Sequence, residues 1–141
     1  YLPRMMKKDW GRIVFISSES GINIPAEMIH YGMTKTAQVA IARGIAESTA
    51  GTGVTSNSVL VGPTASEGVG TFVDSMVQQQ SKSPAQVEAE FFEHIRPSSL
   101  LKRFETVEEV AAMVTFLAGE PASATNGAAL RVDGGVIKAI L

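Results

Sequence analysis

The sequence has no cysteine and only two histidines, His30 and His94. Without cysteine the chain forms neither disulfides nor thiolate metal sites. Two histidines 64 positions apart, with no cysteine to join them, argue against a zinc centre. We therefore expect no metal in the function of this chain.

Charge of either sign is also sparse. The 141 residues include 12 basic and 14 acidic side chains spread along the chain, for a net charge of -2, so no basic surface is expected to attract nucleic acid or an anionic membrane. No apolar run approaches the roughly 20 residues that cross a bilayer, and the start at Tyr1-Leu2-Pro3-Arg4 lacks the apolar stretch of a signal peptide. We expect a cytoplasmic protein with neither nucleic-acid nor membrane partners.

Apolar residues, in contrast, make up 45% of the chain, enough for one core, and the length predicts a single domain over residues 1–141. The sequence begins at Tyr1, without methionine, inside a stretch typical of the end of a helix. We therefore expect it to be a piece of a longer protein.

Three short apolar segments predict strands, at residues 12–16, 54–61 and 128–132. The first is apolar throughout, as a parallel strand covered on both faces should be. Between them, residues 29–49 have helical spacing with apolar residues on more than one face, which favours contacts with both a sheet and a second subunit. This alternation predicts an α/β fold with three parallel strands and flanking helices.

Two sets of helix-start signals mark the later part of the chain. Ser83, Pro84 and Gln86 predict a capping box with a first-position proline, and this helix follows another over about 69–77. Together they suggest a helical substrate lid over about 66–101. Thr106 and Glu109 predict a second capping box, for a helix that ends before Gly119.

The residues suited to chemistry are Ser18, Tyr31 and Lys35. Tyr31 and Lys35 are four positions apart on the long helix, so they share one face. A nearby ammonium lowers the pKa of a phenol, which makes Tyr31 a usable proton donor and acceptor. Ser18 follows the first strand, at the edge where open α/β sheets bind ligands. All three side chains are therefore expected to converge.

A tyrosine and lysine at this spacing are common on helix surfaces, so the pair alone favours solvated side chains. The ordered set carries more weight: Gly11-x-Ile13-x-x-Ile16-Ser17-Ser18, Gly21, Tyr31, Lys35, Asn57, Gly62-Pro63-Thr64, Arg103-Phe104 and Val132-Asp133-Gly134-Gly135. On these residues the chain resembles the short-chain dehydrogenase/reductase family, in its short single-domain branch. The resemblance covers nearly the whole chain and corresponds to the carboxyl-terminal half of a doubly wound, Rossmann-type parallel sheet.

The resemblance implies an NAD(P)-dependent oxidoreductase that interconverts a carbonyl and an alcohol on a small molecule. In it, Tyr31 is the general acid and base, Ser18 orients the substrate oxygen, and Lys35 binds the nicotinamide ribose, lowers the pKa of Tyr31 and passes protons toward solvent. It also implies NAD or NADP as cofactor and a homodimer or homotetramer. The expected cofactor contacts are Ile16, Ser17, Tyr31, Lys35, Val61, Gly62, Pro63, Thr64 and Ser66.

Other chemical interpretations are weaker. His30 points about 100° away from Tyr31 around the helix, which favours a structural role. A serine-hydrolase elbow is excluded because no glycine lies two positions before Ser18 or Ser20. Phe91 and Phe92 are expected to be core residues of the lid rather than substrate contacts.

The sequence also departs from the family pattern. The glycine-rich turn that cradles the pyrophosphate is absent, as are the residue that selects NAD or NADP and the family's catalytic asparagine. Val61 replaces a common proline, and Ser66 a common threonine. An alternative hypothesis follows: a non-catalytic truncated chain that only associates with itself or with intact relatives. In either case we expect these 141 residues alone to be inactive and their first strand to be an unpaired edge.

Overall fold

In the computed structural model, the structure describes residues 1–140, apart from the side chains of Phe72 and Gln80. At its centre is a parallel sheet in the order β1-β2-β3, which confirms the expected sheet. The strands are β1 (Gly11–Ser18), β2 (Val54–Val61) and β3 (Ala129–Val132). β1 is longer than the apolar run 12–16 suggested, because β2 pairs with it from Gly11 through Ser18.

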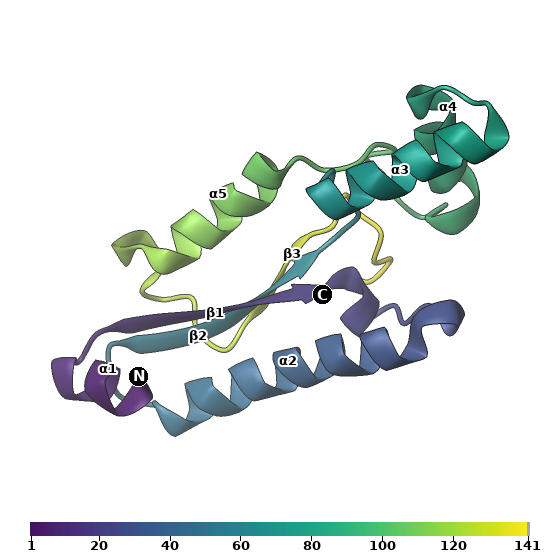
Figure 1. The fold of residues 1–141 in the computed structure, drawn as a ribbon. Helices are drawn as coiled ribbons and strands as arrows, with labels where there is room; N and C mark the ends of the chain where they lie inside the picture. Colours follow the sequence, from purple (N-terminus) through teal and green to yellow (C-terminus); the bar gives the residue numbers. More distant parts are fainter. Residues whose placement is uncertain (141) are drawn as a thin grey trace.

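Two long helices cover opposite faces of this sheet (Figure 1). One is α2 (Ile29–Ser48) and the other is α5 (Val107–Ala118). The buried residues of α2 are small, namely Gly32, Ala42 and Ala46, so the helix can approach the strands closely. Its larger apolar side chains face outward: Met33 is 63% exposed and Ile41 is 52% exposed.

The helix α5 is fixed at its start by the expected capping box. The Thr106 hydroxyl accepts a hydrogen bond from the Glu109 amide, and the Glu109 carboxylate accepts one from the Thr106 amide. Further along α5, Leu117 is fully buried against Val59 and Ala122, in the main core cluster. The core therefore lies between α5 and the sheet.

A helical excursion, residues 66–101, follows β2 and lies beyond the end of the sheet (Figure 1). It contains α3 (Glu67–Gln80), α4 (Pro84–Glu90) and a π-helical turn η3 (Phe91–Ile95). The capping box of Ser83 and Gln86 at the start of α4 is present. Phe91, Phe92 and Phe104 pack together with ring centroids 5.0 to 5.2 Å apart, which holds η3 against the segment leading to α5.

The remaining elements are short. They are α1 (Leu2–Lys8), η1 (Glu19–Gly21), η2 (Ala26–Met28) and η4 (Glu120–Ala122). None of the helices within the described residues combines the length and apolarity needed to span a membrane.

Candidate active site

The carboxyl ends of β1 and β2 lie level with each other, since Ser18 pairs with Val61 in the parallel register. The turn η1 leaves β1 at this point, and the Gly62-Pro63-Thr64 turn leaves β2 beside it. Both turns therefore open on the edge where parallel sheets bind ligands.

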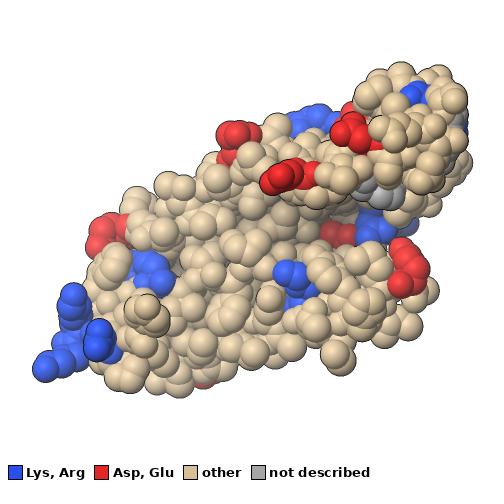
Figure 2. Space-filling view, viewed as in Figure 1, with Lys and Arg blue, Asp and Glu red and all other residues tan. Residues whose placement is uncertain are grey.

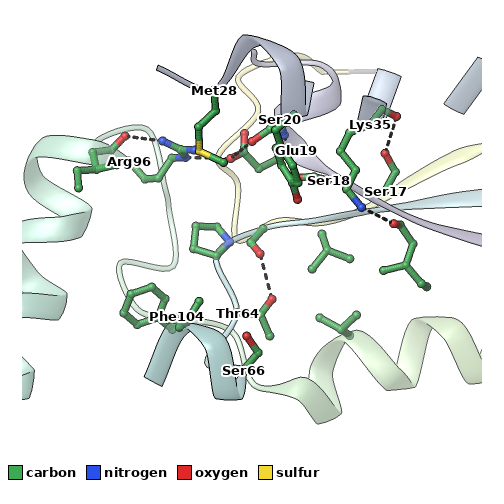
Figure 3. A pocket seen from close by; sticks show the side chains of 18 of the residues that line it. Ser17, Ser18, Glu19, Ser20, Met28, Lys35, Thr64, Ser66, Arg96 and Phe104 are labelled. Atoms are coloured by element: carbon green, nitrogen blue, oxygen red, sulfur yellow. Dashed lines mark hydrogen bonds and ion pairs between the residues drawn. The ribbon is translucent and has the colours of Figure 1, made fainter. Parts of the chain in front are cut away.

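A cavity of about 820 Å³ lies at this edge, below the 66–101 segment, and Figure 3 shows part of its wall. Ser18, Tyr31 and Lys35 all line it. So does every cofactor contact expected from the sequence, namely Ile16, Ser17, Tyr31, Lys35, Val61, Gly62, Pro63, Thr64 and Ser66. The structure thus brings all the candidate residues to one place, while their roles remain predictions.

Ser18 is buried, and its side-chain oxygen accepts a hydrogen bond of 3.1 Å from the Ser20 amide. This contact uses a lone pair of the hydroxyl and leaves its hydrogen free to donate to another group. A substrate oxygen that enters the cavity can accept that hydrogen bond.

Ser17, the preceding residue, points to the opposite side of the strand. Its hydroxyl donates a hydrogen bond of 2.8 Å to the Lys35 carbonyl oxygen. The two adjacent serines thus have different contacts: Ser17 ties β1 to α2, and Ser18 stays available on the cavity wall.

The ammonium group of Lys35 lies between the sheet and Tyr31. It donates a hydrogen bond of 3.0 Å to the Ile16 carbonyl oxygen, contacts the Gln38 side-chain oxygen at 3.4 Å, and lies 5.5 Å from the centroid of the Tyr31 ring. Figure 3 shows the Lys35 side chain reaching toward the end of β1. Lys35 therefore places a positive charge beside the phenol.

The turn after β2 is held by the backbone of Glu105. The Glu105 amide donates to the Pro63 carbonyl oxygen at 2.9 Å, and the Ala65 amide donates to the Glu105 carbonyl oxygen at 2.7 Å. Thr64 donates its hydroxyl hydrogen to the Gly62 carbonyl oxygen, which closes the turn. These bonds give the expected cofactor contacts a fixed backbone.

The Glu105 side chain is a feature that the sequence analysis missed. It is 2% exposed, and neither carboxyl oxygen has a hydrogen-bond partner within the described structure. Burial raises the pKa of Glu105 from 4.5 to about 7, and repulsion from the Asp133 and Glu109 carboxylates adds to the increase, while the nearby Gly62 amide and the charge of Arg103 offset part of it. A neutral carboxyl group therefore lies under the turn below about pH 7.

Sequence analysis also missed an ion pair in the cavity wall, between Glu19 and Arg96. Arg96 Nε donates to Glu19 Oε1 at 2.9 Å, and the Ser20 hydroxyl donates to the same oxygen at 3.1 Å. Figure 3 shows this contact beside Ser18. The position of Glu19 next to Ser18 was a usable signal, whereas Arg96 is 77 positions away along the chain and had none.

The rest of the wall is mostly apolar. Its apolar side chains from outside the predicted set are Met28, Val69, Phe91, Ile95, Phe104, Val107 and Val110. Phe91 lines the cavity and also packs against Phe92 and Phe104, and Phe92 is buried as expected, at 2% exposure. His30 is exposed and is not part of the wall.

The chain resembles known proteins over nearly its whole length. A family model described as enoyl-(acyl carrier protein) reductase matches residues 1–137. Two uncharacterized oxidoreductases of Bacillus subtilis, YvrD and YvaG, are 45% and 44% identical over 99% of this chain, which spans 53% of each. D-beta-hydroxybutyrate dehydrogenase of Cupriavidus necator is 33% identical over 95% of the chain and 51% of its own length. The chain thus spans about half the length of these relatives.

Solved structures show the same relation. YwfH, an NADPH-dependent reductase involved in bacilysin biosynthesis, superposes with a TM-score of 0.81 at 27% identity, over 96% of this chain and 50% of YwfH. Levodione reductase superposes with a TM-score of 0.77 at 28% identity, over 95% and 49% of the two chains. The sheet is therefore half of a Rossmann-type fold. On the match of the family model and these relatives, the chain belongs to the short-chain dehydrogenase/reductase family.

Proposed function

We propose that the protein is an NAD(P)-dependent oxidoreductase that interconverts a carbonyl and an alcohol on a small molecule. The observation that carries this proposal is the meeting of Ser18, Tyr31 and Lys35 on one cavity wall, with the ammonium group of Lys35 5.5 Å from the Tyr31 ring. Family membership and relatives named as a dehydrogenase and as NADPH-dependent reductases support the same chemistry.

Each of the three residues has a role that its contacts allow. Tyr31 gives a proton to the carbonyl oxygen in reduction and takes it back in oxidation. Ser18 donates its free hydroxyl hydrogen to that same oxygen, while one of its lone pairs accepts the hydrogen bond from the Ser20 amide. The positive charge of Lys35 stabilises the phenolate that forms when the proton leaves Tyr31.

The cavity also has a surface suited to a nicotinamide ring. Ile16 is 47% exposed although it lies in a strand, so a flat apolar group placed against it removes apolar surface from water. The other residues that would hold the nucleotide are Ser17, Tyr31, Lys35, Val61, Gly62, Pro63, Thr64 and Ser66. When bound, the cofactor supplies or accepts the hydride. The 66–101 segment acts as the substrate lid.

The first test replaces Tyr31 with phenylalanine in the protein, together with any residues that its gene encodes ahead of Tyr1. Turnover of carbonyl substrates should fall by about 100-fold or more, because the proton donor is lost. Cofactor affinity, measured by fluorescence titration, should change little. Tyr1→Phe is the matched control, since Tyr1 is 99% exposed. Activity retained in Tyr31→Phe would exclude the proposed role.

The half-length match also favours a second candidate, a non-catalytic chain that only associates with itself or with intact relatives. The 141 residues contain no glycine-rich turn for a pyrophosphate. Calorimetry of these 141 residues with NADH and with NADPH tests the second candidate. Tight binding would contradict it, whereas absence of binding is expected under both candidates.

A further inference from the structure

The guanidinium group of Arg96 is only partly used by the protein. Nε donates to Glu19, and Nη1 donates to the Ile95 carbonyl oxygen at 3.0 Å. Nη2 has no hydrogen-bond partner within the described residues, yet the Arg96 side chain is 13% exposed and lines the cavity. Two donor hydrogens on Nη2 are therefore available beside the cavity.

These hydrogens are available close to the reacting centre. Glu19 is bonded to Arg96 and directly follows Ser18 in the chain. The Ser20 amide donates a hydrogen bond to Ser18, and the Ser20 hydroxyl donates one to Glu19. Met28, Phe91 and Ile95 are apolar residues of the same lining, to which Glu27 adds a carboxylate. Lys35 and Arg96 both bring cationic donors to this lining, and Lys35 lies beside Tyr31, so a second polar group of a substrate bound at Ser18 can bind Arg96.

The charge of this donor is compensated. The Glu19 side chain is 4% exposed and bonded to Arg96, so its negative charge is little screened by solvent. Because the Glu19 carboxylate offsets the charge of Arg96, a ligand at Nη2 accepts a hydrogen bond but gains little net electrostatic attraction. A neutral oxygen is therefore favoured over a carboxylate, which Glu19 repels.

We propose that Arg96 is a specificity-determining residue, whose Nη2 donates a hydrogen bond to a neutral second oxygen of the substrate, near the carbonyl that is reduced. The favoured class is a mainly apolar carbonyl compound with an additional ketone or ester oxygen. This proposal rests on the proposed oxidoreductase function.

The experiment compares three carbonyl compounds of similar size: ethyl 3-oxobutanoate, 3-oxobutanoate and 2-hexanone. The protein includes any residues encoded ahead of Tyr1. The ester should have a kcat/KM about 10- to 100-fold above 2-hexanone, the range for a hydrogen bond to a charged group. Arg96→Met, which keeps the side-chain length and removes the donors, should bring the two within about threefold.

Two further variants isolate the cause. Lys82→Met is the matched control, because Lys82 forms an ion pair with Glu90 in the same 66–101 segment but does not line the cavity; it should keep the preference for the ester. Glu19→Gln keeps an oxygen for Arg96 and removes the negative charge. Glu19→Gln should raise kcat/KM for 3-oxobutanoate by about tenfold relative to the ester. A purely structural role of Glu19 and Arg96 would not change this ratio.

The outcomes distinguish this inference from the proposed function. If wild-type protein turns over none of the three compounds, nor other ketones, the oxidoreductase proposal fails and this inference fails with it. If ketones are reduced but the ester has no advantage, or Arg96→Met lowers all three rates equally, only the role of Arg96 is overturned. If Arg96→Met does not fold, Glu19→Gln becomes the test. An unchanged preference between 3-oxobutanoate and the ester in that variant overturns the role of Arg96.

Discussion

At the scale of single residues, the edge of the sheet contains two buried glutamates with different surroundings. Glu19 is bonded to Arg96 and Ser20, and its charge is therefore compensated. Glu105 has no such partner and lies near the Asp133 carboxylate, which accepts hydrogen bonds from the Gly135 and Ile137 amides. An unpaired buried carboxyl group is more stable in its protonated form.

This difference predicts how stability depends on pH. Folded protein keeps the Glu105 proton up to about pH 7, whereas the unfolded chain releases it near the ordinary pKa of 4.5. Between these values the folded state binds more protons, so the free energy of unfolding falls as the pH rises. Glu105→Gln should remove this loss and be more stable than wild type at pH 8 by about 2–3 kcal/mol.

Urea unfolding at pH 5 and pH 8 measures the effect. Glu93→Gln, at an exposed position, is the control for the loss of one negative charge. Equal stability of Glu105→Gln and wild type at pH 8 would mean that the Glu105 carboxyl group has found a partner.

The placement of Ser18, Tyr31 and Lys35 on one cavity could be predicted from the sequence, because they lie at fixed spacings on one strand and one helix, and their catalytic roles stay predictions. Arg96 and Glu105 were missed for a physical reason. Their surroundings are set by loops that meet only after the chain folds, and neither local spacing nor periodicity encodes such a meeting.

At the scale of elements, the turn η1 touches the start of α2 with almost no side chain between them. A Cβ atom on Gly21 would lie 3.0 Å from the Lys35 carbonyl carbon, and one on Gly32 would lie 3.0 Å from the Ser20 carbonyl oxygen. Both contacts are with backbone, which cannot move aside easily. The distance between Ser18 and the Tyr31 helix is therefore set by backbone packing.

Gly21→Ala should consequently separate the turn from the helix by a few tenths of an ångström and lower kcat by about tenfold or more, since small misplacements near reacting groups are costly. Gly44→Ala is the matched control on α2, because a Cβ there meets nothing within 4 Å. It should stabilise the protein by about 0.5–1 kcal/mol with unchanged kcat. Steady-state rates and thermal melts of both variants measure this, and equal kcat values in the two would contradict it.

Element positions were largely predictable, since both capping boxes and all three strands follow from local patterns. The extent of β1 was not, because Ser17 and Ser18 are ordinary loop residues by propensity and become strand residues only through pairing with Leu60 and Val61. The carboxyl end of β1 is therefore determined by its pairing with β2.

At the scale of the whole molecule, two apolar surfaces of the described residues are exposed to solvent. β1 is an edge strand of the sheet, and the outward face of α2 exposes Ile29, Met33 and Ile41 at 65%, 63% and 52%. Figure 2 shows how few charged side chains this view of the molecule presents. Open edges and apolar helix faces both favour association.

We propose that the chain self-associates through α2 as a homodimer or homotetramer. Sedimentation of the 141 residues should show species above 14.9 kDa, and Ile41→Glu should shift them toward monomer, because it places a charge in the interface. Gln78→Glu, at an exposed position on α3, is the control for an added negative charge away from α2. A monomer in wild type at micromolar concentration would contradict the proposal.

The close contact between η1 and α2 limits which residues near the cavity can be replaced independently of one another. Residues 17–21 and 32–36 are joined by the Ser17–Lys35 bond and by the packing at Gly21 and Gly32. Arg96 comes from the 66–101 segment but is bonded to Glu19, which directly follows Ser18. A replacement of Arg96 that alters substrate choice must therefore also provide for the buried Glu19 carboxylate, and the two positions are expected to change together.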